Sequence, residues 1–120
     1  MRLIPMRLTT ALVFTGLIVT ATTSAAMSAG AEEGLSGMHA KVRVGGKLCF
    51  ADHSHAGNSA GHNSRKSAEA AAIRNWQDFT AWEYGLAWGS YSMAAGKSMQ
   101  CSGGGSWGCT IDARPCRGGR

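Results

Sequence analysis

Histidines are the residues of this 120-residue chain whose spacing points most directly to chemistry. His53 and His55 would project to the same side of an extended segment, because alternate side chains share a side, and His62 follows seven residues later. Two imidazoles and a third ligand suit Zn²⁺, Cu²⁺ or Ni²⁺. The favoured interpretation is a solvated loop without a cofactor, because ordering the glycine-rich residues 57–61 would cost conformational entropy. The alternative is a divalent-metal site, with Zn or Cu as the cofactor, at His53, His55 and His62, where Asp52 could also serve as the third ligand.

Two other patterns resemble nucleophile sites but lack the context that such sites need. Residues 57–61 spell G-x-S-x-G around Ser59, a motif that works only at a strand-to-helix turn of a large α/β-hydrolase sheet. Cys49 precedes two histidines, but a thiol nucleophile must be reduced. The sequence therefore predicts no catalytic residue and a protein that is not an enzyme.

The N-terminus predicts export from the cytoplasm. Arg2 and Arg7 flank an apolar run at residues 8–19, and small residues follow it, as in a secretory signal peptide. This run is shorter than the roughly 20 residues that span a bilayer. We expect residues 1–31 to be the signal, with cleavage after Ala31 or Ala26, and a periplasmic or secreted location. The sequence contains no second apolar run, so we expect no transmembrane segment after cleavage. The alternative is that the N-terminal segment is not cleaved and anchors the protein in a membrane.

The cysteines are predicted to form disulfides. Four cysteines in an exported chain of this length are typical of two disulfides, and the C-x-x-C spacing of structural zinc sites is absent. Sequence alone leaves all three connectivities open. The cysteines are Cys49, Cys101, Cys109 and Cys116.

The charge of the exported part is modest. Loss of Arg2 and Arg7 from 12 basic residues leaves ten against seven acidic ones, a net charge of +3. Such a balance permits weak attraction to an anionic envelope component or to another envelope protein, and it does not call for nucleic acid as a partner.

The elements that must position these residues begin after a flexible leader at 32–40. Apolar residues on even positions predict one continuous strand over 41–50, with Gly45 and Gly46 as a bulge; a tight hairpin at the two glycines is the alternative. Residues 51–63 are rich in His, Gly and Ser and are predicted to be a surface loop.

A helix is predicted over 64–83, with Ser64 or Ser67 as its N-cap and Gly85 as its stop. Its apolar face contains Ala68, Ala72, Ile73, Trp76, Phe79 and Thr80. Alternation then predicts a strand over 91–101, interrupted near 94–96, a turn over 102–106 and a strand over 107–114. The result is a single α+β domain at 41–116, in the order β-α-β-β, with one amphipathic helix packed on an antiparallel sheet and a basic tail at 117–120.

The tryptophans divide into core and surface candidates. Trp76 and Trp107 lie on predicted inward faces and should be buried. Trp82 and Trp88 flank the helix stop and are expected to be exposed, where they could stack on sugar rings. Glu83 falls inside the apolar arc and would need a partner, for which Arg114 is the candidate.

The spacing of these residues resembles that of small exported proteins of alphaproteobacteria that carry no assigned activity. The resemblance covers residues 64–117 and implies an envelope or secreted location and a disulfide-bonded fold, without any catalytic residue. It rests on Ala72, Trp76, Tyr84-Gly85, Trp88, Tyr91, Ala94, Lys97, Cys101, Trp107, Cys109 and Ala113-Arg114-Pro115-Cys116.

Overall fold

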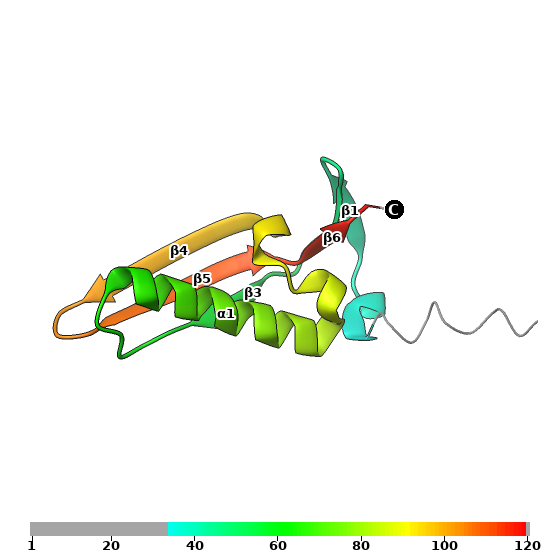
Figure 1. Ribbon diagram of the computed structural model, residues 1–120. Coiled ribbons are helices and arrows are strands. Elements are labelled where there is room, and N and C mark those ends of the chain that lie inside the picture. The colour runs from blue at the N-terminus through cyan, green and yellow to red at the C-terminus, as the bar shows by residue number, and fades with distance from the viewer. Residues whose placement is uncertain (1–33, 120) are drawn as a thin grey trace, which may run out of the picture.

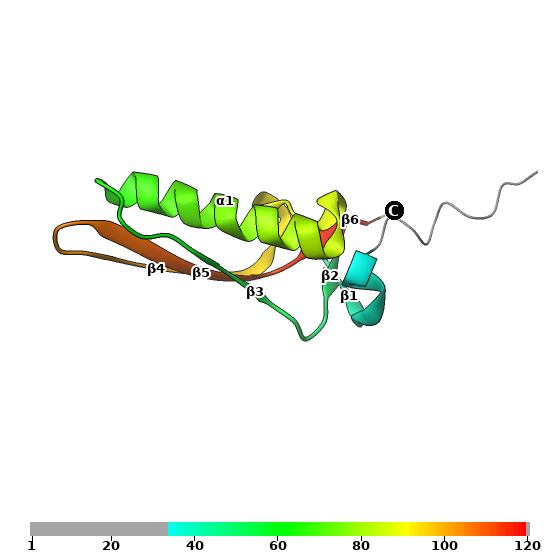
Figure 2. The ribbon, with the colours of Figure 1, turned by 90° about the horizontal axis from the view of Figure 1, so that it is seen from below.

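One long helix lies along one face of an antiparallel sheet, and a second small sheet lies beside the C-terminal end of that helix (Figures 1 and 2). The computed structural model describes residues 34–119, so the predicted signal peptide lies outside the described residues. The elements are η1 (Gly34–Met38), β1 (Lys41–Val44), β2 (Lys47–Phe50), β3 (His55–Asn58), α1 (Arg65–Tyr84), η2 (Leu86–Trp88), η3 (Tyr91–Met93), β4 (Ala95–Gly103), β5 (Trp107–Arg114) and β6 (Cys116–Gly118). The predicted disulfide-stabilised α+β domain is confirmed, but the order β-α-β-β omits three of its strands.

The larger sheet has the strand order β3-β5-β4. The β4–β5 hairpin was predicted, although residues 91–93, expected in its first strand, form the 3₁₀ turn η3. Strand β3 was missed, because residues 51–63 were expected to be a loop; His55 instead pairs with Ala113, and Asn58 with Thr110. Its glycine and alanine composition reflects close packing against the helix.

Gly57 shows how close that packing is. A Cβ atom at this position would lie 2.6 Å from the carbonyl oxygen of Ala72 and 2.7 Å from the Cβ of Trp76. Both neighbours belong to α1, so a larger residue in β3 would push the helix away from the sheet. The small side chain that made this segment resemble a loop is what allows it to be a strand under a helix.

We therefore expect Gly57→Ala to lower the free energy of unfolding by about 1–3 kcal/mol, the usual cost of overpacking a core. Urea unfolding followed by circular dichroism measures this change. The matched control is Gly104→Ala, because a Cβ there has no heavy atom within 4 Å. Equal effects of the two substitutions would contradict the packing described for β3.

Helix α1 begins and ends as predicted. The Ser64 hydroxyl accepts a hydrogen bond from the Ser67 N–H, and the Gly85 N–H donates to the carbonyl of Ala81. The buried face is narrower than the predicted arc and follows a spacing of four residues: Ala68, Ala72, Trp76, Thr80 and Tyr84. Phe79, expected in this face, is 45% exposed, because a single sheet beneath a straight helix covers only a narrow stripe.

The smaller sheet has the strand order β1-β2-β6. The continuous strand expected over 41–50 is wrong; Val44 pairs with Lys47 across a two-residue turn. Gly45 has φ of +59°, the backbone conformation that such hairpin turns require. The prediction of a basic tail at 117–120 is also wrong in part, since Arg117 belongs to β6 and pairs with Leu48 of β2.

The two disulfides join cysteines that face each other across neighbouring antiparallel strands. Cys49 in β2 bonds to Cys116 in β6, and Cys101 in β4 bonds to Cys109 in β5. Each sheet therefore carries one covalent link between adjacent strands. The predicted pair of disulfides is confirmed, and the structure selects one of the three connectivities.

The segment before β1 packs on the domain. The flexible leader expected at 32–40 includes the 3₁₀ helix η1, in which Ser36 is completely buried. The ring of His39 also stacks on that of Phe50, with centroids 4.8 Å apart. Residues 34–40 are thus part of the fold, and their lack of periodicity reflects a 3₁₀ turn too short to show one.

Candidate functional site

Two predicted metal ligands meet at a buried phenol at the C-terminal end of α1. The hydroxyl of Tyr84 lies 2.8 Å from Nε2 of His55 and 2.9 Å from Nε2 of His53. Nε2 of His55 also lies 3.0 Å from a carboxylate oxygen of Glu83. Tyr84 and His55 are buried, at 1% and 7% exposure. We call the side chains of His53, His55, Glu83 and Tyr84 the histidine–tyrosine cluster.

Burial dominates the electrostatics of this cluster. It lowers the pKa of His55 below its ordinary value of 6.5, and the nearby Glu83 carboxylate, which acts in the opposite direction, does not overcome it. Burial and the same carboxylate raise the pKa of Tyr84 to about 12. Around neutral pH the phenol therefore keeps its proton, and it can donate to one histidine while accepting from the other.

Aromatic rings hold the cluster in place. His39 stacks on His53 with ring centroids 4.6 Å apart, and Phe50 meets Tyr84 edge-on at 4.8 Å. Phe50 also packs against Trp88, at 4.6 Å. The side chains come from the segment before β1, from β2, from the segment leading into β3 and from α1, so the cluster joins the smaller sheet to the helix.

The lowered pKa of His55 makes stability depend on pH. The unfolded chain takes up a proton near pH 6.5 while the folded chain does not, so the free energy of unfolding should decrease as pH falls below about 6.5. The groups that act on His55 are Glu83, His53, His39 and Asp112. We expect His55→Gln to be less stable at neutral pH but to lose less stability between about pH 7 and about pH 5 than the wild type.

Urea midpoints at both pH values measure this difference. Ala56→Ser changes the exposed neighbour of His55 on β3 without removing an ionisable group, so it should keep the wild-type dependence. An unchanged dependence in His55→Gln would show that burial of His55 is not its source.

The third predicted metal ligand lies elsewhere. The backbone of His62 bridges to Trp107, whereas His55 pairs with Ala113 on the same strand β5. Six residues of strand separate these positions, about 20 Å at ~3.3 Å per residue. The structure thus brings His53 and His55 together but not His62. Within residues 34–119, no three His, Cys, Asp or Glu side chains form a group that could hold a metal ion.

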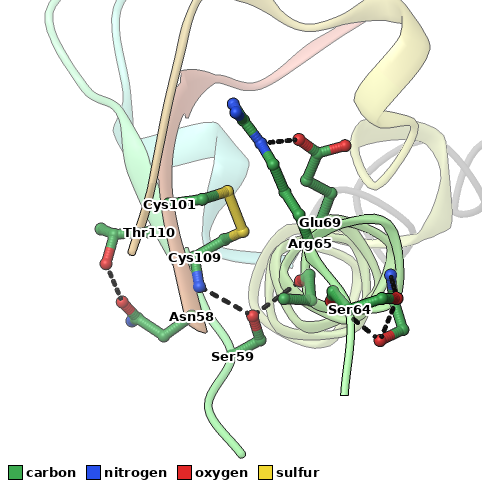
Figure 3. The surroundings of a disulfide bond; sticks show 10 residues. Asn58, Ser59, Ser64, Arg65, Glu69, Cys101, Cys109 and Thr110 are labelled. Atoms are coloured by element: carbon green, nitrogen blue, oxygen red, sulfur yellow. Dashed lines mark hydrogen bonds and ion pairs between the residues drawn. A yellow bond between two sulfur atoms is a disulfide. The ribbon is translucent and has the colours of Figure 1, made fainter. Parts of the chain in front are cut away.

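Ser59 of the G-x-S-x-G pattern has a structural role. Its hydroxyl donates to the carbonyl of Ala68 at 2.6 Å and accepts from the backbone N–H of Cys109 at 3.0 Å, so it links α1 to β5 beside the Cys101–Cys109 disulfide (Figure 3). A hollow of about 510 Å³ lies at this place. Its wall is formed mainly by small and polar residues: Ser59, Ala60, Gly61, Gln100, Cys101, Ser102, Ser106, Gly108, Cys109 and Thr110. The histidine–tyrosine cluster does not line it.

The elements η1, β1 and η2 lie around the C-terminal end of α1, at the end of the molecule away from the turn between β4 and β5 (Figure 1). Among the described residues, six large hydrophobic side chains are exposed, and all six lie on these elements: Leu35, Met38, Val42, Phe79, Trp82 and Leu86. Met38, Trp82 and Leu86 are at least 80% exposed. We call this set the apolar end.

The smaller sheet adds positive charge to this end of the molecule. Its strands carry Lys41, Arg43, Lys47 and Arg117 and no acidic residue. Lys41 and Arg117 lie over the ring of Trp88, at 5.8 and 5.3 Å from its centroid. Trp88 belongs to η2, the same short element that carries the exposed Leu86.

Two predictions about this region need correction. Trp88, expected to be exposed beside Trp82, is 1% exposed, because η2 turns it onto Phe50. Glu83 meets His55 instead of the predicted Arg114. Arg114 donates to the carbonyls of Phe50 and Ala51, which its position at the end of β5 brings within reach.

Sequence reasoning missed Tyr84 as the centre of the cluster, and it missed Leu35, Met38 and Leu86 as surface residues. Tyr84 falls four residues after Thr80, which continues the i, i+4 stripe of the helix, so the spacing contained a signal for its burial. No comparable signal marks Leu86, because a 3₁₀ turn of three residues has no measurable periodicity.

Comparison of the chain with family models, with curated proteins and with solved structures gave no match. None of the helices within residues 34–119 is long and apolar enough to cross a membrane.

Proposed function

We propose that this protein is an exported, non-enzymatic binding module of the cell envelope that acts through its apolar end. The observation that carries the proposal is the gathering of all six exposed large apolar side chains of the described residues at one end of the fold. Scattered surface hydrophobics are ordinary, whereas exposed hydrophobic side chains concentrated in one region usually mark an interaction site.

Two further features support the exported location. Both disulfides are of the kind that persists in oxidising compartments, and the N-terminal sequence has the organisation of a secretory signal. The resemblance to small exported alphaproteobacterial proteins agrees with this location. A chain with two cross-strand disulfides suits a role in which a small rigid domain presents a surface.

The engagement of the reactive side chains supports a binding role. The Ser59 hydroxyl is occupied by two backbone groups, and Cys49 is held in a disulfide. The phenol of Tyr84 is held between two histidines in the interior. Their contacts hold the helix and the two sheets together.

Site-directed photo-crosslinking in an expressing bacterium tests the proposal. A benzophenone amino acid would replace Trp82 at the apolar end or, as a control, the exposed Lys66 near the start of α1. We expect a defined adduct with an envelope component, identified by mass spectrometry, from position 82 and none from position 66. Equal labelling from both positions, or no adduct from position 82, would reject the apolar end as the binding surface. Turnover of a substrate by the purified protein, abolished by His55→Gln, would reject the non-enzymatic role.

A further inference from the structure

We infer that the partner of the apolar end is an anionic phospholipid bilayer, into whose interfacial layer Trp82, Leu86 and Met38 insert. This inference rests on the proposed function and names its ligand. The described domain would lie on the membrane surface by its apolar end, with the larger sheet and most of α1 remaining in water.

The shape and composition of the apolar end fit the interface of a bilayer. Trp82 lies in the last turn of α1 and Leu86 begins η2 directly after Gly85, and Phe79 packs beside Trp82 with ring centroids 6.0 Å apart. Met38 and Leu35 come from η1, which packs against the same end of α1. Individual side chains at 80–88% exposure project into solvent, as insertion among lipid headgroups requires. Tryptophan in particular favours this layer, because its ring is apolar and its N–H is polar.

The charge of the smaller sheet fits the same surface. Arg43 is exposed on β1, an edge strand of the smaller sheet. The three strands of this sheet contain no acidic residue, and their basic residues are Lys41, Arg43, Lys47 and Arg117. Basic groups beside inserted apolar side chains are attracted to anionic lipid headgroups. Apolar insertion and charge attraction therefore act at the same end of the molecule.

The same charges disfavour a second copy of the chain as the partner. In a symmetric dimer the same patch on both subunits faces itself. Two apolar ends in contact would bring two all-basic sheets close to each other, where like charges repel. A bilayer that contains anionic lipid offers an apolar layer and opposite charge together.

Vesicle binding by the processed protein, purified from an expressing bacterium, tests the inference. Sedimentation with phosphatidylcholine vesicles that contain phosphatidylglycerol should capture the protein, and pure phosphatidylcholine should capture much less. The double variant Trp82→Ser/Leu86→Ser should bind at least about tenfold more weakly, since it removes two large inserted side chains. Arg43→Gln should weaken binding to the anionic vesicles, whereas Lys66→Gln, the same charge change near the start of α1, should not.

Tryptophan fluorescence gives an independent readout. Trp76 and Trp88 are buried at 0% and 1% exposure. The partly buried Trp107 begins β5, away from the apolar end, so a blue shift on adding vesicles should come mainly from Trp82. Trp82→Phe should keep most of the binding and lose most of the shift. Sedimentation that is insensitive to Trp82→Ser/Leu86→Ser, or no sedimentation at all, would overturn the inference.

The two proposals can fail separately. If vesicles do not bind while position 82 still crosslinks to an envelope protein or polysaccharide, the bilayer is the wrong partner and the binding surface stands. If the protein forms a dimer that Trp82→Ser/Leu86→Ser disrupts and does not bind vesicles, the bilayer is again rejected. If neither vesicles nor crosslinks involve position 82, both proposals are wrong.

Discussion

Replacing Trp76 with alanine should lower the free energy of unfolding by about 3–5 kcal/mol, the usual range for removing a large buried aromatic side chain. Trp76 is completely buried between α1 and the larger sheet. Its indole N–H also donates to the carbonyls of His55 and Ala113, at 2.9 and 3.3 Å, and these would lose a donor. Because small domains have only ~5–15 kcal/mol of stability in total, this substitution should remove much of it.

The same helix provides a matched control. Trp82 lies six residues later and is 81% exposed, so Trp82→Ala should change stability by no more than about 0.5 kcal/mol. Trp76→Phe, which keeps most of the ring and removes the N–H, should fall between the two. Urea unfolding of the three variants gives the comparison. Similar losses for Trp76→Ala and Trp82→Ala would contradict the assignment of one tryptophan to the core and the other to the surface.

Removing the Cys49–Cys116 disulfide should cost more than removing the Cys101–Cys109 disulfide. The first joins residues 67 positions apart, the second residues 8 apart. In the chain-entropy model these separations correspond to about 4 and about 2.5 kcal/mol, because the longer closed loop restricts the unfolded chain more. The first disulfide also ties β6, a three-residue strand, to the rest of the smaller sheet.

The two double variants, Cys49→Ala/Cys116→Ala and Cys101→Ala/Cys109→Ala, allow a direct comparison by urea unfolding. Each leaves the other disulfide in place and introduces no free thiol. We expect the first to have the lower midpoint. The reverse order would show that native packing around the hairpin disulfide, and not loop length, determines the cost.

Features with strong local rules could be predicted from the sequence. Ser64 and Gly85 bound the helix because capping depends on residues within one turn. The β4–β5 hairpin could be located because alternation over residues 107–114 is long enough to detect. The two disulfides followed from an even cysteine count together with predicted export, although their pairing required the register of the strands.

Features that depend on close approach between elements could not be predicted. Gly57 looks like a loop residue until the helix lies over it, and Gly45 permits either a bulge or a turn. This choice decides which residues share a face of the β1–β2 hairpin, because a turn places Leu48 and Phe50 on the opposite face from Val42 and Val44. Leu48 and Phe50 therefore face the core with Trp88, while Val42 is 42% exposed.

The candidate site was predicted only in part for the same reason. His53 and His55 were selected by their spacing, which does bring them together. Their hydrogen-bond partner, Tyr84, is 29 residues from His55 in the chain, so local spacing could not identify it. The direction of β3 places His62 far from the other two histidines. The apolar end combines residues of three short elements with residues of the last turns of α1, and the individual patterns give no sign of a shared surface.

Cell fractionation shows whether the apolar end attaches this protein to the cell envelope. Osmotic shock of an expressing bacterium, followed by separation of envelope and soluble fractions, would compare the wild type with Trp82→Ser/Leu86→Ser and with Lys66→Gln. We predict that the wild type and Lys66→Gln stay with the envelope, while the double variant, folded by circular dichroism, moves to the soluble fraction. Retention of the folded double variant to the same extent as the wild type would contradict the account.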